Sequence, residues 1–349
     1  MAQHVNSKNF WFWQELKQFS GEIVVIVMKI GLLVLTASVF FSCTASAQQA
    51  DTLIHKLDSL QRREDTLGDI SNNIKPTAYN ENTRISFSDY FVLLGSDLKQ
   101  QVTAPFRLNG RDALKVGMFV GGLAVLSSID EPVQKLAVHA KDNNTLSSVS
   151  SYVTNSGGIY EAYTLVALGS YGFIFKNVKM QTTTLLATQA YLTSGTMEGI
   201  IKFIAGRQRP NYYDPSRDEA EPTFHGPFYK PGNPEINGNH LSASFPSGHT
   251  TVAFAAATVF AMEYKNTPWV PVVSYSAAGL IGASRITENK HWFTDVVAGA
   301  ALGYLCGRQV VNNYHRYATL KSQRAKGKLS FNLGYSNGTL MPDLVYTFR

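Results

Sequence analysis

Cysteine is scarce in this chain, with two residues among 349. Cys43 lies in an apolar N-terminal segment, and Cys306 lies in a later helical pattern. Two cysteines exclude a cysteine-rich metal site. They also exclude a disulfide framework if the segment that carries Cys43 is removed from the mature protein.

Charged residues are also few, at 16% of the chain, whereas hydrophobic residues make up 44%. This balance favours a large buried or membrane-contacting surface. The formal net charge of +6 is compatible with attraction to anionic lipids or phosphorylated substrates, and equally with a mildly basic surface that has no such partner. There is no dense run of basic residues with interleaved aromatics, so nucleic-acid binding has little support.

Long uninterrupted apolar runs are rare as well, because most are shorter than the roughly 20 residues of a membrane span. Shorter apolar stretches, rich in Ala, Leu, Val and Gly and bounded by polar residues or by Pro and Gly, recur at residues 113–129, 159–175, 183–204, 250–264, 269–283 and 295–310. Each is long enough for a helix. The fold class predicted is therefore all-α, a helical bundle. The pattern allows either a soluble bundle core or helices that cross a membrane.

Glycines within two of these stretches suit close contact between helices. They are Gly117, Gly121 and Gly122 in the first stretch, and Gly299 and Gly303 in the last. A small residue lets two helix backbones approach each other, in a membrane bundle or in any tightly packed one.

The N-terminus has the features of an export signal. Residues 30–41 are nearly all apolar, and the small residues Ala45 and Ala47 that follow fit a cleavage site before Gln48. We expect residues 1–47 to be a signal peptide, with Met28 as the possible true start of translation. Export places the rest of the chain outside the cytosol.

A polar segment separates the expected signal peptide from the helical part of the chain. Residues 48–88 are polar, with Leu53, Leu57 and Leu60 at helical spacing, and predict a short helix followed by a linker. Residues 89–317 contain the apolar stretches and form the expected helical-bundle domain.

The C-terminal segment, residues 318–349, predicts a basic linker and a small β-hairpin. Side chains alternate from Leu329 onwards, and Asn337-Gly338 is a hairpin turn signal. This tail can pack locally or pair with another protein of the envelope.

A long insertion, residues 211–245, lies between two clusters of polar residues. It begins directly after Arg209-Pro210 and ends directly before Pro246. A long loop in a compact domain is usually functional or disordered. We expect it to act as a lid or as a substrate-contact loop.

The first polar cluster joins Lys202 to Arg209-Pro210. The two cations are seven residues apart, which places them on one face of a helix that Pro210 is expected to end. Charges on the inner face of an apolar helix are costly unless they meet an anion. A basic pair reaching to water from a helix end is the common alternative.

The second cluster is Pro246-Ser247-Gly248-His249 at the start of an alanine-rich stretch. Ser247 is a candidate helix N-cap, Gly248 lets the backbone approach a ligand, and His249 falls in the first turn. Free amides at such a helix start point towards an anion. An ordinary Ser-Gly cap with an incidental histidine is the alternative.

The third cluster is Ser284-Arg285, followed by His291 and Asp295. Histidine and aspartate four residues apart can touch on one helical face. An aspartate bonded to one ring nitrogen fixes the tautomer and leaves the other nitrogen free as a nucleophile. An exposed pair of little consequence is the alternative, which the neighbouring Trp292 weakens.

The order and spacing of the three clusters resemble a known signature. The pattern Lys202-x6-Arg209-Pro210, Pro246-Ser247-Gly248-His249 and Ser284-Arg285-x5-His291-x3-Asp295 is similar to that of the type-2 phosphatidic acid phosphatase and vanadium haloperoxidase superfamily. The match is complete at each signature position and covers roughly residues 89–315. The resemblance implies the helical bundle of that superfamily.

The resemblance also implies a role for each residue. His291 resembles the nucleophile that forms a phosphohistidine, Asp295 the group that orients it, and His249 the general acid for the leaving oxygen. The residues that would bind phosphate are Lys202, Arg209, Ser247, Gly248 and Arg285. Three fixed cations would do the charge work of a metal, so neither a metal nor another cofactor is expected.

We therefore expect a phosphoric monoester hydrolase of the cell envelope, membrane-associated and facing the periplasm, that acts on the monophosphate or diphosphate of a lipid. Phosphatidate, phosphatidylglycerophosphate, an isoprenyl diphosphate and lipid A are the candidates. The alternatives are a soluble periplasmic acid phosphatase, which a mean hydropathy of −0.09 favours, a vanadate-dependent haloperoxidase and an inactive envelope scaffold.

Overall fold

The computed structural model describes residues 52–61, 78–141, 143–212, 222–227, 244–326, 329–336 and 339–346. The chain divides into two units, Met1–His55 and Lys56–Arg349, and every labelled helix and strand below lies in the second. The expected signal peptide, the Met28 start and most of the 211–245 insertion lie outside the described residues.

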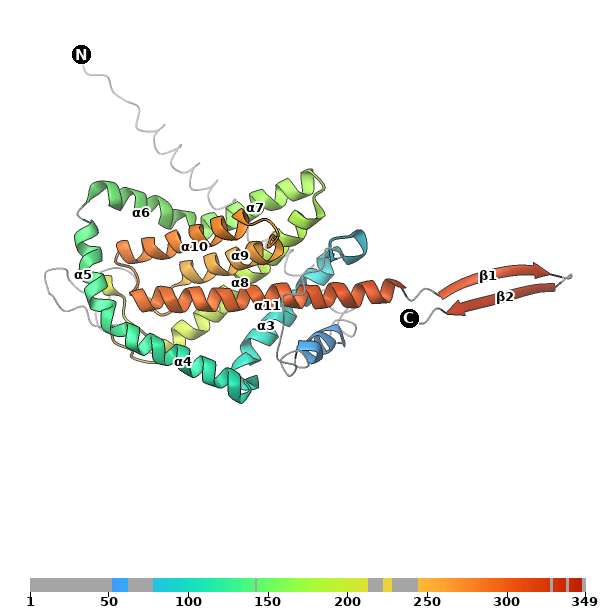
Figure 1. Cartoon of the computed structure of the whole chain (residues 1–349), viewed down its shortest axis with the longest axis horizontal. Helices are drawn as coiled ribbons and strands as arrows, with labels where there is room; N and C mark the ends of the chain where they lie inside the picture. The colour runs from blue at the N-terminus through green and yellow to red at the C-terminus, as the bar shows by residue number, and fades with distance from the viewer. Residues whose placement is uncertain are drawn as a thin grey trace, which may run out of the picture. The chain divides into compact units, whose positions relative to one another are not determined.

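The domain is helical in the part that carries the polar clusters, as the sequence predicts (Figure 1). The described helices are α3 (Phe87–Thr103), α4 (Gly110–Leu126), α5 (Asp130–Lys141), α6 (Asn144–Ser156), α7 (Ile159–Ile174), α8 (Val178–Ala205), α9 (Gly248–Glu263), α10 (Trp269–Thr287) and α11 (Phe293–Lys326).

Six of these helices, α4 and α7 to α11, coincide with the six apolar stretches. Apolar periodicity missed the other three because they are more polar. In α6 seven residues are serine or threonine, which favour caps and turns over helix interiors. The signal that could have found α6 is local, since the Asn143 side chain accepts hydrogen bonds from the amides of Thr145 and Leu146 at 3.1 and 3.2 Å.

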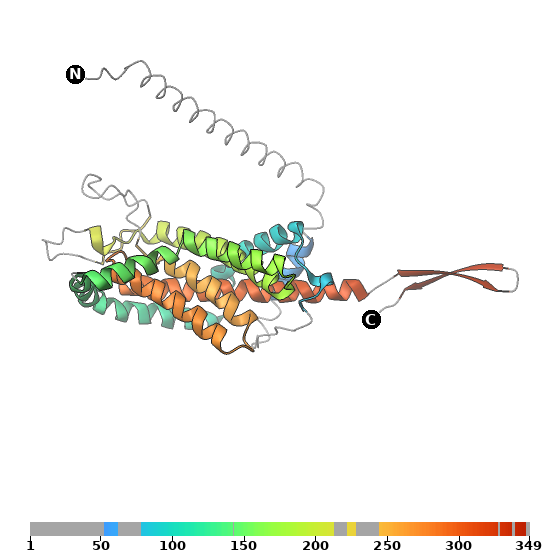
Figure 2. The same cartoon turned by 90° about the horizontal axis from the view of Figure 1, so that it is seen from above.

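Helix α9 occupies the middle of the bundle, with α8, α10 and α11 packed around it (Figure 2). Glycines of α11 make its closest approach possible. A Cβ atom added to Gly299 would lie 2.7 Å from the backbone oxygen of Ser247, and one added to Gly307 would lie 2.5 Å from that of Ala255. Gly303 faces the backbone of the same helix between them. The prediction of close contacts at Gly299 and Gly303 is confirmed.

The same prediction is wrong for α4. Added Cβ atoms at Gly117, Gly121 and Gly122 would meet nothing within 4 Å. This helix instead exposes apolar side chains, among them Leu114, Met118, Val120 and Val125. By length and composition, the segment Gly110–His139 is the one helical stretch among the described residues that is able to cross a membrane.

Residues 52–61 are helical and Leu57 is fully buried, which confirms the short helix expected in the polar N-terminal segment. Beyond α11 the chain runs as β1 (Leu329–Ser336) and β2 (Thr339–Tyr346), antiparallel, with Leu329 opposite Tyr346. This pair is not part of the helical body, and the hairpin tail stays a prediction from the sequence.

Candidate active site

The first cluster is divided by the end of a helix. Helix α8 stops at Ala205, and Gly206 caps it in the left-handed conformation at φ 55°, donating its amide to the Lys202 oxygen at 3.0 Å. Lys202 therefore lies in the last turn and Arg209 beyond the helix. The predicted shared helical face is wrong, because Gly206 ends the helix before Pro210 does.

The second cluster starts α9 as predicted, with Ser247 as N-cap residue and His249 in the first turn. The Ser247 hydroxyl makes no capping bond; it accepts from Thr250 Oγ1 at 2.8 Å. A Cβ atom added to Gly248 would lie 3.4 Å from Lys202 Nζ. The missing side chain thus lets the end of α8 lie against the start of α9.

The third cluster spans the loop between α10 and α11. Arg285 lies in the last turn of α10, His291 in the loop and Asp295 in the first turn of α11. The predicted common helical face for His291 and Asp295 is therefore wrong. Nδ1 of His291 lies 3.7 Å from Asp295 Oδ2 and only 2.8 Å from the backbone oxygen of Ser244.

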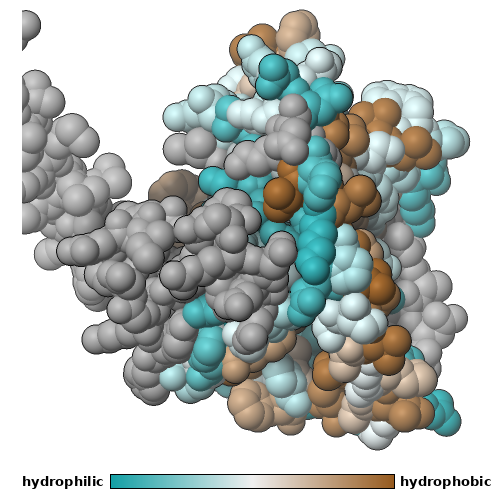
Figure 3. Space-filling view, turned by 90° about the vertical axis from the view of Figure 1, so that its left-hand side faces the viewer, coloured by the Kyte–Doolittle hydropathy of each residue, from teal (hydrophilic) through white to brown (hydrophobic). Residues whose placement is uncertain are grey.

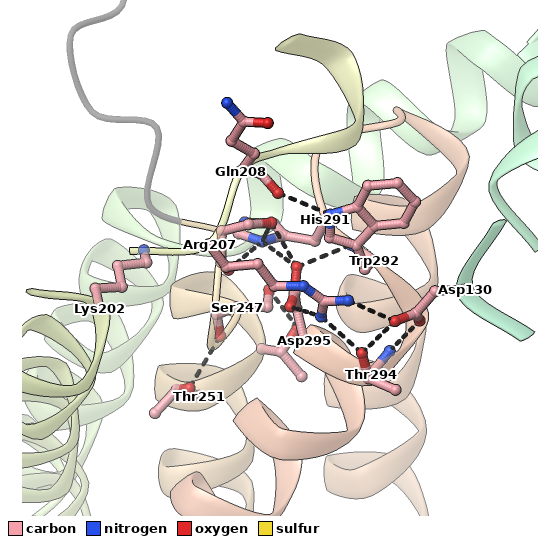
Figure 4. A network of polar contacts seen from close by, with 12 residues as sticks. Asp130, Lys202, Arg207, Gln208, Ser247, Thr251, His291, Trp292, Thr294 and Asp295 are labelled. Carbon is pink, nitrogen blue, oxygen red and sulfur yellow. Dashed lines mark hydrogen bonds and ion pairs between the residues drawn. The ribbon is translucent and has the colours of Figure 1, made fainter. Parts of the chain in front are cut away.

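Asp295 is held from several sides (Figure 4). Its Oδ2 accepts from the Trp292 amide at 2.9 Å and from the Ser244 hydroxyl at 2.5 Å, and its Oδ1 pairs with Arg207 at 2.6 Å. Burial alone would raise the pKa of Asp295, but the neighbouring His291 and the charge of Arg207 hold that pKa below its ordinary value. The carboxyl group is therefore ionised beside the imidazole.

The two histidines experience the cations of all three clusters. Burial, followed by the positive charges of Arg285, Lys202 and Arg209, lowers the pKa of His249 to about 4. Burial also lowers the pKa of His291 to about 3, with Asp295 opposing the shift and the two arginines adding to it. Both imidazoles are neutral at physiological pH, and the cations that the sequence predicted as one set lie near them.

Two of these cations have buried donors without partners. Nε of Arg209 and Nε of Arg285 are buried and have no hydrogen-bond partner among the described residues. Nη1 of Arg285 lies 3.3 Å from Glu288 Oε2, and Lys202 pairs with Glu198. Buried unpaired donors on cations are costly unless an anion meets them. The arrangement suits a tetrahedral anion with several oxygen atoms.

Sequence reasoning missed the turn between α6 and α7 that packs against the ring of His249. Gly158, at φ 63°, joins α6 to α7, and a Cβ atom on it would lie 3.0 Å from Nε2 of His249. The Gly157-Gly158 pair is a turn signal that was available in the sequence. Nothing in the sequence indicates that the turn meets a residue more than ninety positions away.

Part of the long insertion adjoins the site. Phe224 bridges to Arg207 in an isolated antiparallel pair, and the guanidinium lies 4.7 Å from the centroid of the Phe224 ring. The ring of Phe224 also packs edge-on against Phe245 at 5.5 Å. Residues 222–227 are thus beside the second and third clusters. The lid role of the whole insertion stays a prediction.

The end of the bundle that carries these loops has a mixed surface. Figure 3 shows a band of hydrophilic side chains running down this face, with apolar side chains along its flank. Exposed apolar residues at this end of α8 include Ile200, Phe203 and Ile204. A charged site beside exposed apolar side chains suits a substrate with a polar head and an apolar body.

Comparison with known proteins agrees with the signature. The family described as the PAP2 superfamily matches residues 183–318. A lipid A 1-phosphatase of Porphyromonas gingivalis is 52% identical over 65 residues, which are 18% of this chain and 15% of that protein. Lipid phosphate phosphatase 1 of Arabidopsis thaliana is 32% identical over 163 residues, which are 40% and 49% of the two chains. The chain thus spans half or less of the length of these relatives.

A solved structure also aligns with the helical body. It is the crystal structure of a transmembrane PAP2 type phosphatidylglycerolphosphate phosphatase from Bacillus subtilis, at 21% identity and a TM-score of 0.41. The alignment covers 58% of this chain and 96% of that one.

Proposed function

We propose that the chain is a metal-independent phosphatase that hydrolyses the phosphate monoester or diphosphate of a membrane lipid, which the match of residues 183–318 to the PAP2 superfamily supports. The observation that carries the proposal is the pair of buried, unpartnered Nε donors of Arg209 and Arg285 beside two neutral imidazoles. Fixed donors aimed at an anion stabilise the charge of phosphoryl transfer without a bound metal.

The phosphate would be held by Lys202, Arg209 and Arg285. The first turn of α9, with Ser247 and the amide of Gly248, would close the cradle. Glu198 and Glu288, which pair with two of the cations in the structure described, would give way to the phosphoryl oxygens.

His291 would be the nucleophile. Nδ1 lies 2.8 Å from the Ser244 backbone oxygen, and a carbonyl accepts only, so Nδ1 must carry the proton. Nε2 then has a free lone pair. It attacks phosphorus as the bond to the lipid oxygen breaks, and the ionised Asp295 stabilises the imidazolium that forms.

His249 would donate a proton to the leaving oxygen and later take one from the water that releases inorganic phosphate. A general acid must be protonated, whereas cations and burial lower the pKa of His249 to about 4. A bound phosphate dianion places negative charge beside the ring and raises that pKa. Substrate binding would therefore supply the proton that His249 uses.

A lipid substrate is favoured by the exposed apolar side chains of α4, α7 and α10. The relatives named lipid A 1-phosphatase and lipid phosphate phosphatase support the same class. We propose membrane association with the site on the periplasmic side after removal of residues 1–47. The phosphatase domain, expected at residues 89–317, would begin with α3 at Phe87 and end with α11 at Lys326, because α11 continues through the start of the expected basic linker 318–349. The helix and linker of residues 48–86 would precede it, and the hairpin tail would follow.

A panel of pure phosphates tests the function. Phosphate release would be measured from lipid A, phosphatidate, phosphatidylglycerophosphate, an isoprenyl diphosphate and a soluble aryl phosphate, with a chelator present. We expect the lipids to be preferred and both His249→Ala and His291→Ala to lose turnover. Equal rates with the aryl phosphate and no need for detergent would support a soluble acid phosphatase instead. Full activity in His291→Ala would exclude the phosphohistidine route.

A further inference from the structure

Arg207 is the most buried cation of the site region, and the phosphatase signature does not include it. Its side chain is 1% exposed. One terminal nitrogen lies 2.6 Å from Asp295 Oδ1 and 2.7 Å from Thr294 Oγ1, and the other lies 2.6 Å from Asp130 Oδ2. Figure 4 shows the guanidinium directed to these groups and away from Lys202. Both terminal nitrogens of Arg207 are therefore occupied by protein groups, while its buried Nε has no hydrogen-bond partner among the described residues.

The backbone of Arg207 holds a second part of the same arrangement. Its carbonyl oxygen accepts the amide of Ser244 at 2.8 Å. The carbonyl of Ser244 in turn accepts from Nδ1 of His291, and its hydroxyl donates to Asp295 Oδ2. Arg207 thus contacts both groups that surround Nδ1 of His291, one with its side chain and one with its backbone.

Asp130 gives this arginine a fixed direction. It lies at the start of α5, is fully buried, and accepts from Arg207, from the Thr294 amide at 2.9 Å and from the Thr294 hydroxyl at 2.6 Å. A planar guanidinium held at both terminal nitrogens has one orientation only. The carboxylate of Asp295 is then oriented too, with Oδ1 bound to Arg207 and Oδ2 facing the imidazole.

We propose that Arg207, anchored by Asp130, is a positioning residue for the nucleophile: it fixes the Asp295 carboxylate and the Ser244 segment so that His291 presents Nε2 to phosphorus. The inference rests on the proposed phosphatase function. It adds a buried Asp130–Arg207–Asp295–His291 relay to the three signature clusters, with α5 as a fourth element of the site.

The charges around Asp295 and His291 predict a pH signature. Arg207 and Arg209 are the cations that face Asp295, Arg209 and Arg285 are those that face His291, and Asp130 lies behind Arg207. Removing the Arg207 charge makes the potential at both groups more negative, so protonation of each becomes easier. If activity requires both groups deprotonated, the acid limb of kcat/KM moves to higher pH. If Arg207 had a purely structural role, its removal would lower kcat/KM at every pH and leave the pH of the acid limb unchanged.

The variants are designed so that folding does not decide the outcome. Arg207→Gln alone leaves two buried carboxylates without their cation. Arg207→Gln with Asp130→Asn removes one charge of each sign. The matched control is Arg107→Gln with Asp58→Asn, the same exchange at a partly buried pair 3.0 Å apart that joins the turn after α3 to the helix of residues 52–61. Arg207→Lys keeps the positive charge but loses the planar guanidinium that binds Asp130 and Asp295 at the same time. Each protein would be purified in detergent and its Tm recorded.

We expect Arg207→Gln/Asp130→Asn to lower kcat about tenfold while KM stays within about threefold, and to move the acid limb upward by roughly 0.5–1 pH unit. Arg207→Lys should recover part of kcat and restore the limb. In an Asp295→Asn background, Arg207→Gln should add less than about threefold, because both act through one carboxylate.

The control variant Arg107→Gln/Asp58→Asn should have the same kcat and the same acid limb of kcat/KM as the unmodified enzyme. A wild-type kcat in Arg207→Gln/Asp130→Asn would overturn the proposal, as would a lowered kcat with an unmoved limb or a full additive loss in the Asp295→Asn background. Failure of the proposed function itself looks different: unmodified protein would release no phosphate, or His291→Ala would release as much.

Discussion

Nδ1 of His291 lies 2.8 Å from the backbone oxygen of Ser244 and 3.7 Å from Oδ2 of Asp295. The proton on Nδ1 is therefore directed to a main-chain carbonyl, which no substitution of a side chain removes. Asp295 contributes its charge more than its hydrogen bond. The Ser244 carbonyl therefore fixes the tautomer of the imidazole, and the Asp295 carboxylate would stabilise the imidazolium.

The first prediction concerns Asp295→Asn. Where an aspartate alone fixes the tautomer of a catalytic histidine, its amide variant loses about 10⁴-fold in kcat. Here the Ser244 carbonyl still fixes the tautomer, so we expect a loss of about 10²-fold, the size typical of one electrostatic contribution. Single-turnover kinetics would measure it, with His291→Ala as the inactive reference. A loss as large as that of His291→Ala would show that the carbonyl does not hold the proton.

The residues of the three clusters could be identified from the sequence because their types and spacing carry the chemistry. Their placement could not. Lys202 and Arg209 look like one helical face, but Gly206 takes the left-handed conformation and ends α8 between them. His291 and Asp295 look like a helical pair, but α11 begins at Phe293, between the two residues. In both cases a local helix end overrode the spacing of side chains.

The parts of the site that the sequence did not reveal share one property: they depend on contacts between distant segments. Arg207 differs from Arg209 by two positions, and only the fold directs it to Asp130 of α5. Ser244 contacts the ring of His291 through its backbone carbonyl, which any residue possesses. Helices were predicted well where apolar periodicity was strong, and α3, α5 and α6 were missed where polar residues interrupted it.

The second prediction is that Gly158→Ala impairs turnover and, because a side chain is strained at this backbone conformation, also lowers Tm. Gly158 has a φ of 63°, and a Cβ atom there would lie 3.0 Å from Nε2 of His249. The ring must move, and a displacement of about 1 Å in a catalytic group can cost up to about 10²-fold in rate. We expect kcat/KM to fall by about tenfold or more.

Gly199→Ala is the matched control for that substitution, because a Cβ atom on this residue of α8 would meet nothing within 4 Å. It should keep full activity and gain slightly in stability, as alanine favours helix over glycine. Comparison of kcat/KM and Tm for the two variants separates the contact with His249 from the general effect of an added methyl group. Equal activity of both variants would place His249 elsewhere during catalysis.

The third prediction tests the close packing of α9 and α11. At Gly303→Ala an added Cβ atom would lie 2.9 Å from the Ala255 amide nitrogen, which is backbone and cannot rotate away. We expect a destabilisation of about 1–3 kcal/mol from overpacking. Gly117→Ala on α4 adds the same methyl group into open space and should be neutral or slightly stabilising. Thermal unfolding in a single detergent would compare them, and equal Tm values would contradict the packing described.

The fourth prediction concerns the affinity of the site for an anion as the pH changes. Cations and burial lower the pKa of His249 to about 4 in the anion-free site. A bound oxyanion dianion reverses the local charge and raises that pKa, so at a pH between the two values binding takes up a proton. By linkage, a site that gains a proton on binding binds more tightly as the pH falls.

Competitive inhibition by tungstate, used at concentrations low enough that it remains the monomeric tetrahedral dianion, gives the measurement. We expect its inhibition constant to decrease as the pH falls, by at most about tenfold per pH unit for one proton. In His249→Gln the slope should disappear while weak inhibition remains, because Lys202, Arg209 and Arg285 still hold the anion. A slope that persists in this variant would assign the proton uptake to another group. A slope of opposite sign in the unmodified enzyme would mean that His249 does not gain a proton when the anion binds, and the role of general acid would then need a different residue.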